Sequence, residues 1–344
     1  MKNHFLNIIR PLIIFRFSIF SLMITFSFGH PAIAQVYSKK NPLVHTYSIV
    51  ARDAATGEMA VGVQSHWFSV GSVVSWGEAG VGVIATQSFV NKSFGIRGLD
   101  LLKQGHTPEE ALEILLSENA EKEVRQVAIL SNQGNIATHT GKNCIEYAGH
   151  SKGKDFSVQA NMMLSDKVWP AMAKAFEVSD NLPLAERVIA AMEAAEKAGG
   201  DIRGKQSAAL LVVRGISSSE PWNDRLIDLR VEDHKDPVKE LDRLLRSFRA
   251  YEHMDQGDEY MAKGMMSEAL GEYQKAQTML PKNLEMKYWH AITLANNKEI
   301  EAAIDILRRV YKEDKNWKIL TNRLPEAGLL NLDQWDLERI LNVK

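Results

Sequence analysis

The sequence predicts an α+β fold in which stacked antiparallel sheets carry helices on their outer faces and an all-helical region follows. Segments with strand periodicity alternate with helical segments along residues 46–236. Most consecutive strands are joined by short turns and not by single crossover helices, which favours antiparallel sheets over a doubly wound parallel sheet. From Pro237 onward almost every residue is a helix former. We therefore expect a sheet-rich domain over residues 46–236 and a helical domain over residues 237–344.

The first strands form a predicted hairpin. Residues 46–53 and 59–66 alternate with a period of two residues, which is typical of strands. Asp53 opens the segment between them and Gly57 stands near its end, and both residue types are common in hairpin turns. A third strand is expected over residues 80–87.

The register of this hairpin predicts which residues meet at one edge of the sheet. If the chain turns near its middle, antiparallel pairing sets Thr46 opposite Ser65, with His66 one step beyond. The third strand ends in Thr86 and Gln87, at what we expect to be the same edge. Strand ends and loops commonly carry functional residues, so this edge is the first candidate site.

The remaining elements of the large domain follow from periodicity and capping signals. An amphipathic segment over residues 99–123 is interrupted at Gly105, and Thr107 and Pro108 provide an N-cap and a first helical position for its second half. Helices are expected over residues 167–179 and 184–198, and strands over residues 125–130, 135–140, 156–164, 206–214 and 226–231.

The first 34 residues have the pattern of a cleaved signal peptide. Basic residues precede an apolar run over residues 17–28, and Ala32-Ile33-Ala34 matches a cleavage site before Gln35. The run is too short to span a bilayer comfortably, and no later stretch has the length and hydropathy of a membrane helix. We expect a periplasmic or secreted protein with a short lead segment, residues 35–45, before the large domain.

Composition excludes several functional classes. The 344 residues have a net charge of −2, and loss of the basic leader makes the chain more acidic, which argues against nucleic acid as a partner. The single cysteine, Cys144, cannot form an intramolecular disulfide. Cysteine and histidine spacings typical of zinc sites do not occur, so we expect no metal and no cofactor.

The helical region contains an internal repeat that resembles tetratricopeptide units. Small and large residues stand where the paired helices of such a unit pack, and they recur after about 34 residues. His253 replaces the Trp common near the start of a unit, and Lys315 stands where Pro is usual. Such a module predicts a protein partner. The repeat positions are Gly257, Tyr260, Ala269, Tyr273, Ala276 and Pro281, then Ala291, Leu294, Ala303, Leu307 and Val310.

Residues 46–236 resemble a bacterial family known as domain of unknown function 1028. The motifs that carry the resemblance are TYSIVARDAATGEMAVGVQS, VGSVVSWGEAGVGVIATQ, GIRGLDLL, GGDIRGKQSAALLVV and DRLIDLRVEDHKDPV. The family is placed in the N-terminal-nucleophile (Ntn) hydrolase superfamily. The resemblance therefore implies a four-layer αββα sandwich, which agrees with the order of elements above, but it implies no established substrate.

The resemblance also implies a role for Thr46, since the superfamily places its nucleophile at the start of the first strand. Such a residue attacks an amide carbonyl and uses its own α-amine as the base. Signal cleavage would leave Gln35 at the N-terminus, so Thr46 needs a second cut at the His45–Thr46 bond. The alternative is that Thr46 is only a β-branched residue that opens a strand. Both interpretations stay open.

Further polar residues are candidates for the same site. Ser65 and His66 are expected to assist catalysis beside Thr46, although they could equally form a solvated strand end. The candidates for substrate binding are Thr86, Gln87, Asn91, Asn161, Asp201, Arg203, Gln206 and Ser207. The alternative for Thr86, Gln87 and Asn91 is loop capping, and the alternative for Asn161 is a hydrogen bond within the core. The last four residues surround a Gly-rich turn, and their alternative is an ion pair that fixes this turn.

Two functions of different classes remain. The first is an exported Ntn-type amidohydrolase or peptidase that acts on a small amide or peptide, with Thr46 as nucleophile. The second is a catalytically silent Ntn fold that binds a ligand or cell-wall fragment, with the helical module recruiting a partner. The state of the mature N-terminus distinguishes them, and the sequence leaves homo-oligomer formation open.

Overall fold

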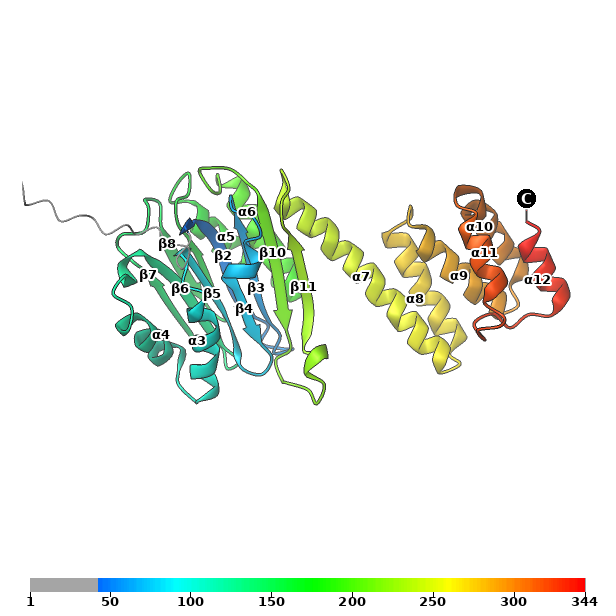
Figure 1. Ribbon diagram of the computed structural model, residues 1–344, viewed down its shortest axis with the longest axis horizontal. Coiled ribbons are helices and arrows are strands. Elements are labelled where there is room, and N and C mark those ends of the chain that lie inside the picture. Colours follow the sequence, from blue (N-terminus) through cyan, green and yellow to red (C-terminus); the bar gives the residue numbers. More distant parts are fainter. Residues whose placement is uncertain (1–42, 344) are drawn as a thin grey trace, which may run out of the picture. The chain divides into compact units, whose positions relative to one another are not determined.

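The computed structural model describes residues 43–343. The expected signal peptide and most of the lead segment lie outside these residues. The strands from residue 43 to residue 231 form two antiparallel sheets (Figure 1). The strands are β1 (Leu43–Val44), β2 (Thr46–Arg52), β3 (Met59–Ser65), β4 (Ser75–Glu78), β5 (Gly82–Phe89), β6 (Arg125–Ser131), β7 (Ile136–Thr140), β8 (Gly149–Gly153), β9 (Phe156–Ala160), β10 (Ser207–Val213) and β11 (Arg225–Val231).

The smaller sheet has the order β1-β5-β6-β7, with β4 also paired to β5. The larger sheet has the order β11-β10-β3-β2-β9-β8, so that β2 and β3 lie at its centre. The helices of this region are α2 (Gly71–Val74), α3 (Ser93–Lys103), α4 (Pro108–Ser117), α5 (Val168–Val178) and α6 (Leu184–Lys197), with 3-10 turns η1 (Lys122–Val124) and η2 (Pro221–Asn223).

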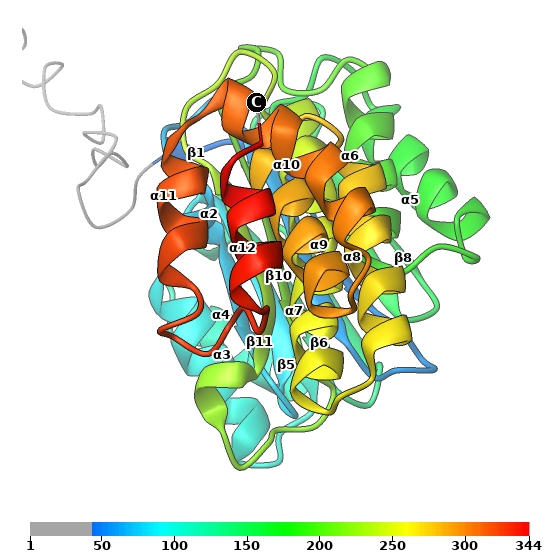
Figure 2. The same ribbon diagram turned by 90° about the vertical axis from the view of Figure 1, so that its right-hand side faces the viewer.

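Three apolar cores show that the layers are stacked in the order helix, sheet, sheet, helix. Val61 and Val83 belong to the core between the two sheets. Ile49 packs beneath α5 and α6 on the other face of the larger sheet. Ile84 and Ile129 pack beneath α3 and α4 on the outer face of the smaller sheet. Figure 2 shows α3 and α4 on one side of the strands and α5 and α6 on the other. This arrangement confirms the expected α+β class and four-layer αββα sandwich.

The predicted register of the first hairpin is confirmed. Thr46 pairs with Ser65 and Arg52 pairs with Met59. The turn is fixed by Asp53, whose side chain accepts hydrogen bonds from two backbone N–H groups of the turn, and by Gly57 at a φ of 77°. Positive φ values favour glycine because it has no Cβ.

Several elements differ from the sequence-based expectation. The third strand runs over Gly82–Phe89, and not residues 80–87, because a turn through Gly80 at a φ of 72° separates it from β4. The short strands β1, β4 and β8 were not expected. The first outer helix begins at Ser93, earlier than predicted, whereas the restart at Thr107 is confirmed as a capping box with Glu110.

Residues 237–343 are helical, as the sequence predicts. The residues expected to bring paired helices close together are buried, among them Ala269, Ala276 and Ala303. At Gly257, an added Cβ would lie 2.6 Å from the ring of Tyr273. The tetratricopeptide identity of this region stays a prediction. The helices are α7 (Pro237–Ala262), α8 (Met266–Met279), α9 (Leu284–Asn296), α10 (Ile300–Glu313), α11 (Asn316–Arg323) and α12 (Gln334–Leu341).

The first half of α7 packs on the sandwich. Val238, Leu241 and Leu245 are buried in the core formed by α5, α6 and the larger sheet. Arg249 also forms an ion pair of 2.9 Å with Glu186 of α6. Along residues 43–343, none of the helices combines the length and apolar character that crossing a membrane requires.

Candidate functional site

Thr46 lies at the start of β2 and is completely buried, with His45 and Val44 buried before it. The strand β1 fixes this preceding segment, since Leu43 pairs with Phe89 and Val44 pairs with Ser88. The Thr46 hydroxyl donates a hydrogen bond to the Val44 carbonyl at 3.0 Å. The nitrogen of Thr46 is part of the His45–Thr46 amide in this chain, so it is not basic.

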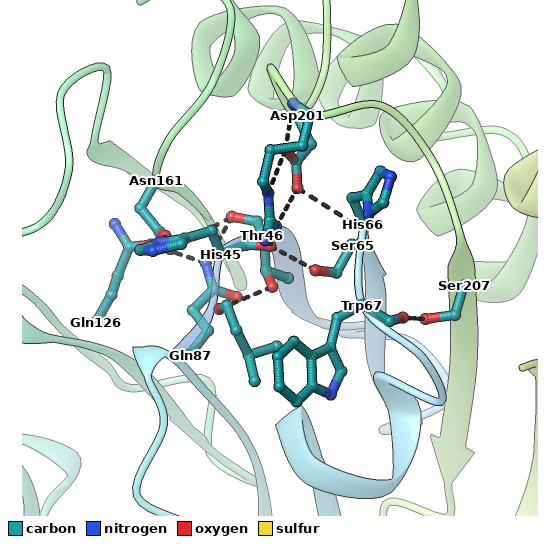
Figure 3. A network of polar contacts seen from close by, with 12 residues as sticks. His45, Thr46, Ser65, His66, Trp67, Gln87, Gln126, Asn161, Asp201 and Ser207 are labelled. Atoms are coloured by element: carbon teal, nitrogen blue, oxygen red, sulfur yellow. Dashed lines mark hydrogen bonds and ion pairs between the residues drawn. The ribbon is translucent and has the colours of Figure 1, made fainter. Parts of the chain in front are cut away.

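The carbonyl of His45 receives two hydrogen bonds from residues far away in the sequence (Figure 3). The Ser65 hydroxyl donates to it from the paired strand β3. The Arg203 guanidinium donates to it at 2.8 Å from the loop before β10. Paired donors of this kind, one of them cationic, are what a developing oxyanion requires. The amide that must be cut to free the Thr46 amine therefore has an already polarised carbonyl.

Asp201 holds Arg203 in place. Its two carboxylate oxygens accept from the guanidinium at 3.0 and 2.7 Å, and from the Arg203 backbone N–H at 2.9 Å. The Asp201 side chain is fully buried, and the backbone N–H of His66 also donates to it at 3.2 Å. A two-point ion pair fixes the direction of a guanidinium, so Asp201 is a positioning residue.

The carbonyl of Thr46 is held on the other side by amides. The backbone N–H of Asn161 donates to it at 3.1 Å, and the Gln87 side-chain amide donates at 3.2 Å. The oxygen of the Gln126 side chain accepts from both Gln87 and Asn161, at 2.7 and 2.8 Å. This network crosses from one sheet to the other (Figure 3). It makes the start of β2 rigid, because each buried amide has partners.

The His45 imidazole is buried and neutral. Its Nδ1 lies 2.6 Å from Oδ1 of Asn161, and its ring meets the Phe89 ring edge-on at 6.0 Å. Burial lowers the pKa of His45 to about 4, because the charged form loses its hydration. Its Nε2 is buried without a hydrogen-bond partner among residues 43–343.

The structure brings some of the predicted residues together and leaves others apart. Thr46, Ser65, Gln87, Asn161, Asp201 and Arg203 surround the His45–Thr46 bond. The other five predicted residues do not form side-chain hydrogen bonds to this bond in the described part of the chain.

Those five residues have other roles. Thr86 bonds the Asn91 carbonyl at 3.4 Å, and the Asn91 side chain accepts from Ser93 at the start of α3. Ser207 donates to the Trp67 carbonyl and accepts from the backbone of Val70, so it holds the loop after β3. His66 is exposed, and the Gln206 backbone pairs with the end of β3. For Thr86, Asn91 and His66 these roles match the structural alternatives stated above, whereas the ion pair of the Gly-rich segment joins Asp201 and Arg203 and does not involve Gln206 or Ser207.

Sequence reasoning missed His45 and Gln126. Gln126 is completely buried and bonds Ala160, Gly149 and Thr140 through its Nε2. A Gln directly before the apolar run of residues 127–130 is a signal that could have found it, because buried amides need partners. His45 stood in the expected lead segment, so only its place before Thr46 pointed to it. Among residues 43–343, no cluster of three metal-ligating side chains occurs.

Comparisons with known proteins agree with this architecture. The family model described as "Family of unknown function (DUF1028)" matches residues 46–241. The crystal structure of protein SPO2555 from Silicibacter pomeroyi, described with the same family model, has 30% sequence identity and a TM-score of 0.53. The match covers 59% of this chain and 85% of that one.

A second solved structure, Anbu (ancestral beta-subunit) from Yersinia bercovieri, has 12% identity and a TM-score of 0.29, with 57% of this chain and 91% of that chain covered. This likeness is too slight to support an inference. No match was found among curated proteins. The family model covers more than half of the sequence, including every element of the sandwich from β2 to β11. The chain therefore belongs to the DUF1028 family.

Proposed function

We propose that the sandwich is an Ntn-type amidohydrolase or peptidase that acts on a small amide or peptide, with Thr46 as its nucleophile. One observation carries this proposal: the carbonyl of the His45–Thr46 bond accepts from both Ser65 and Arg203. An ordinary strand start does not need a buried hydroxyl and a guanidinium on the carbonyl that precedes it. The match to the family model also begins at Thr46.

The first reaction frees the Thr46 amine. The Thr46 hydroxyl oxygen attacks the His45 carbonyl carbon, and Ser65 and Arg203 stabilise the oxyanion that forms. The attack closes a five-membered ring, and it requires the Thr46 hydroxyl to leave its hydrogen bond with the Val44 carbonyl. The C–N bond then breaks, and the hydroxyl proton ends on the Thr46 nitrogen. Water hydrolyses the resulting ester, which releases a His45 carboxylate and restores the hydroxyl.

The second reaction is the turnover of substrate. The free Thr46 amine accepts the proton of its own hydroxyl as the oxygen attacks a substrate amide. The amine then gives this proton to the leaving nitrogen as the substrate C–N bond breaks, and water hydrolyses the acyl-enzyme ester, which restores the hydroxyl. Ser65 and Arg203 donate hydrogen bonds to the substrate carbonyl, as they do to the carbonyl of His45. Asn161 and Gln87 hold the Thr46 carbonyl, which keeps the nucleophile in place.

A binding function remains the second candidate, and one observation favours it. Thr46 is completely buried beneath a segment that is itself paired to β5. A chain that keeps its His45–Thr46 bond has neither a basic amine nor an accessible hydroxyl. In that case the sandwich is catalytically silent and binds a ligand or wall fragment, and the helical region recruits a protein partner.

Hydrolysis assays on the cut chain distinguish these functions. A panel of chromogenic amides and short peptides should reveal activity that Thr46→Ala removes and Thr46→Ser partly keeps, because Ser retains a hydroxyl and an amine. Loss of a nucleophile that acts with its own base lowers the rate by several orders of magnitude. Full activity in a chain with an intact His45–Thr46 bond would contradict the proposal. Absence of activity together with an intact bond would favour the binding function.

Export forms part of the proposal. The basic start, apolar run and Ala-x-Ala site of the first 34 residues support it, although they lie outside the described residues. Fractionation should recover the protein from the periplasm or the medium, beginning at Gln35 or later. Full-length protein retained in the cytosol would contradict export.

A further inference from the structure

We propose that Leu43, Val44 and His45 occupy the acyl half of the substrate site, and that the substrate is a peptide bound as a short extended strand on β5. Its residue before the cleaved bond has a neutral ring that donates a hydrogen bond, as His45 has. The inference rests on the proposed function and adds the substrate class. The lead segment is then the first substrate of the site.

The edge of β5 supplies the backbone part of this site. β4 covers that edge only from Gly82 to Ala85. The next covered positions, Ser88 and Phe89, pair with β1, and the opposite edge of β5 pairs with β6. Departure of β1 would therefore expose a short stretch of strand edge that ends beside Thr46. An exposed edge binds extended peptides through main-chain hydrogen bonds.

The conformation of Ser88 is consistent with a functional edge. Ser88 has a φ of 70°, a value that residues other than glycine rarely adopt. Strained backbone concentrates at functional sites, where the surrounding structure holds it in place. Ser88 is completely buried and pairs with the backbone of Val44.

The second residue before the cleaved bond has an apolar subsite. Val44 is completely buried and belongs to the core between the two sheets, which also contains Val63 and Val70. A carboxylate or ammonium at this position would lose its hydration without gaining a charged partner. The subsite therefore selects a branched apolar side chain.

The residue immediately before the cleaved bond has a subsite of mixed character. Oδ1 of Asn161 lies 2.6 Å from Nδ1 of His45, and Phe89 meets the ring edge-on. A carboxylate at this position would face the Asn161 oxygen and would lack a donor there. This subsite selects a flat, uncharged ring with one N–H, and it disfavours acidic residues.

The carbonyl of the residue before the cleaved bond has a defined position in the site. Ser65 and Arg203 already bond the His45 carbonyl, which is where the carbonyl of a substrate must lie. After the cut, the same donors face a carboxylate, which a guanidinium binds well. The released segment should therefore bind again as a product, and it provides a probe that does not depend on turnover.

The test measures binding of acetyl-Leu-Val-His, with a free carboxylate, to the chain that begins at Thr46. Translation from Met followed by Thr46, with removal of the Met, provides this chain. Fluorescence anisotropy of a labelled peptide should show saturable binding. Acetyl-Leu-Asp-His and acetyl-Leu-Val-Asp should each bind at least about 10-fold more weakly, because each leaves a charge without a partner. The uncut Thr46→Ala chain should not bind, since its own lead segment fills the site.

Two variants separate the subsite from general destabilisation. Phe89→Leu removes the ring beside His45 and should weaken binding of the His peptide while reducing the preference over the Asp peptide. Phe156→Leu makes the same change at a buried position of β9 that pairs with Ala51, and it should leave binding unchanged.

Failure of this inference and failure of the proposed function have different signatures. Peptide binding without hydrolysis of any amide would support the site and contradict the enzyme. Hydrolysis of amides without binding of the His peptide, or without a preference over the Asp peptides, would overturn the peptide-strand inference alone. If the chain beginning at Thr46 is unfolded, addition of the peptide should restore its melting transition. A chain that remains unfolded with the peptide present would also overturn the inference.

Discussion

Replacement of Arg203 by Met should slow the cutting of the His45–Thr46 bond by about 100-fold. Arg203 is one of two donors to the His45 carbonyl, at 2.8 Å, and it is the cationic one. Removal of one oxyanion donor lowers rates by about 10²–10³-fold. We expect the lower end of this range because 28% of the Arg203 side chain is exposed, so water can replace part of its effect. A 100-fold change corresponds to about 3 kcal/mol of activation free energy.

The assay follows intact mass over time after the denatured, uncut chain is refolded. Loss of residues 1–45 in one step reports the cut directly. Arg203→Lys should be intermediate, because an ammonium cannot bond Asp201 at two points and the His45 carbonyl as well.

Two controls test whether the effect comes from the donor. Arg52 lies at the other end of β2 and forms a 2.9 Å ion pair with Asp155, with a side chain that is 19% exposed. Arg52→Met therefore removes a similar ion pair and should leave the cutting rate unchanged. Arg203→Met also leaves the buried Asp201 without its cation, so the double variant with Asp201→Asn separates folding from chemistry. A normal cutting rate in a folded Arg203→Met chain would show that Arg203 does not stabilise the oxyanion.

Three further predictions concern stability. Burial lowers the pKa of His45 from 6.5 to about 4, so the uncut folded chain binds fewer protons than the unfolded chain. Its free energy of unfolding in urea should be highest above pH 6.5 and fall by about 3 kcal/mol towards pH 4, and His45→Gln should remove this loss. Gly257→Ala should lower the melting temperature, because its Cβ would lie 2.6 Å from the Tyr273 ring, whereas Gly271→Ala, with no atom within 4 Å, should raise it slightly. The free energy of unfolding of a chain that ends at Asp236 should be lower by about 5–9 kcal/mol, because three buried aliphatic side chains of α7 leave the sandwich core. A chain that keeps the first half of α7 should fold normally.

Local chemistry was sufficient to predict the first hairpin and its register. Asp53 and Gly57 define the turn, and the turn fixes every pair along β2 and β3. The pair of Thr46 and Ser65 followed from this without knowledge of the other strands. The capping box at Thr107 was equally local, because its partners are three residues apart.

The contacts between the sheets could not be predicted in this way. Gln87 bonds both Gln126 and the Thr46 carbonyl at the start of β2, and Gln126 bonds the Ala160 carbonyl, but these strands meet only through the stacking of the whole fold. The strand β1 has two residues, which is too few for a periodic pattern. The sequence therefore predicted residues of the candidate site, but it did not predict that the His45 carbonyl lies at its centre.

Strand periodicity separates the roles of Thr86 and Gln87. Adjacent residues of a strand face opposite sides of its sheet, so Thr86 and Gln87 cannot both face Thr46. Gln87 shares the inner face with Val83 and Ala85, and Thr86 shares the outer face with Ile84. Both faces of β5 are apolar and buried, so the sequence alone does not decide which of the two residues faces inward.

The proposed function requires that the chain itself cuts the His45–Thr46 bond. The most direct measurement is the intact mass of the purified, refolded protein, incubated without any protease and compared with Thr46→Ala prepared in parallel. The wild-type chain should convert with time to one that begins at Thr46, at a rate independent of protein concentration, whereas Thr46→Ala should keep the bond. A folded wild-type chain that retains His45 on Thr46 indefinitely, or a Thr46→Ala chain that is cut equally fast, would contradict self-cleavage.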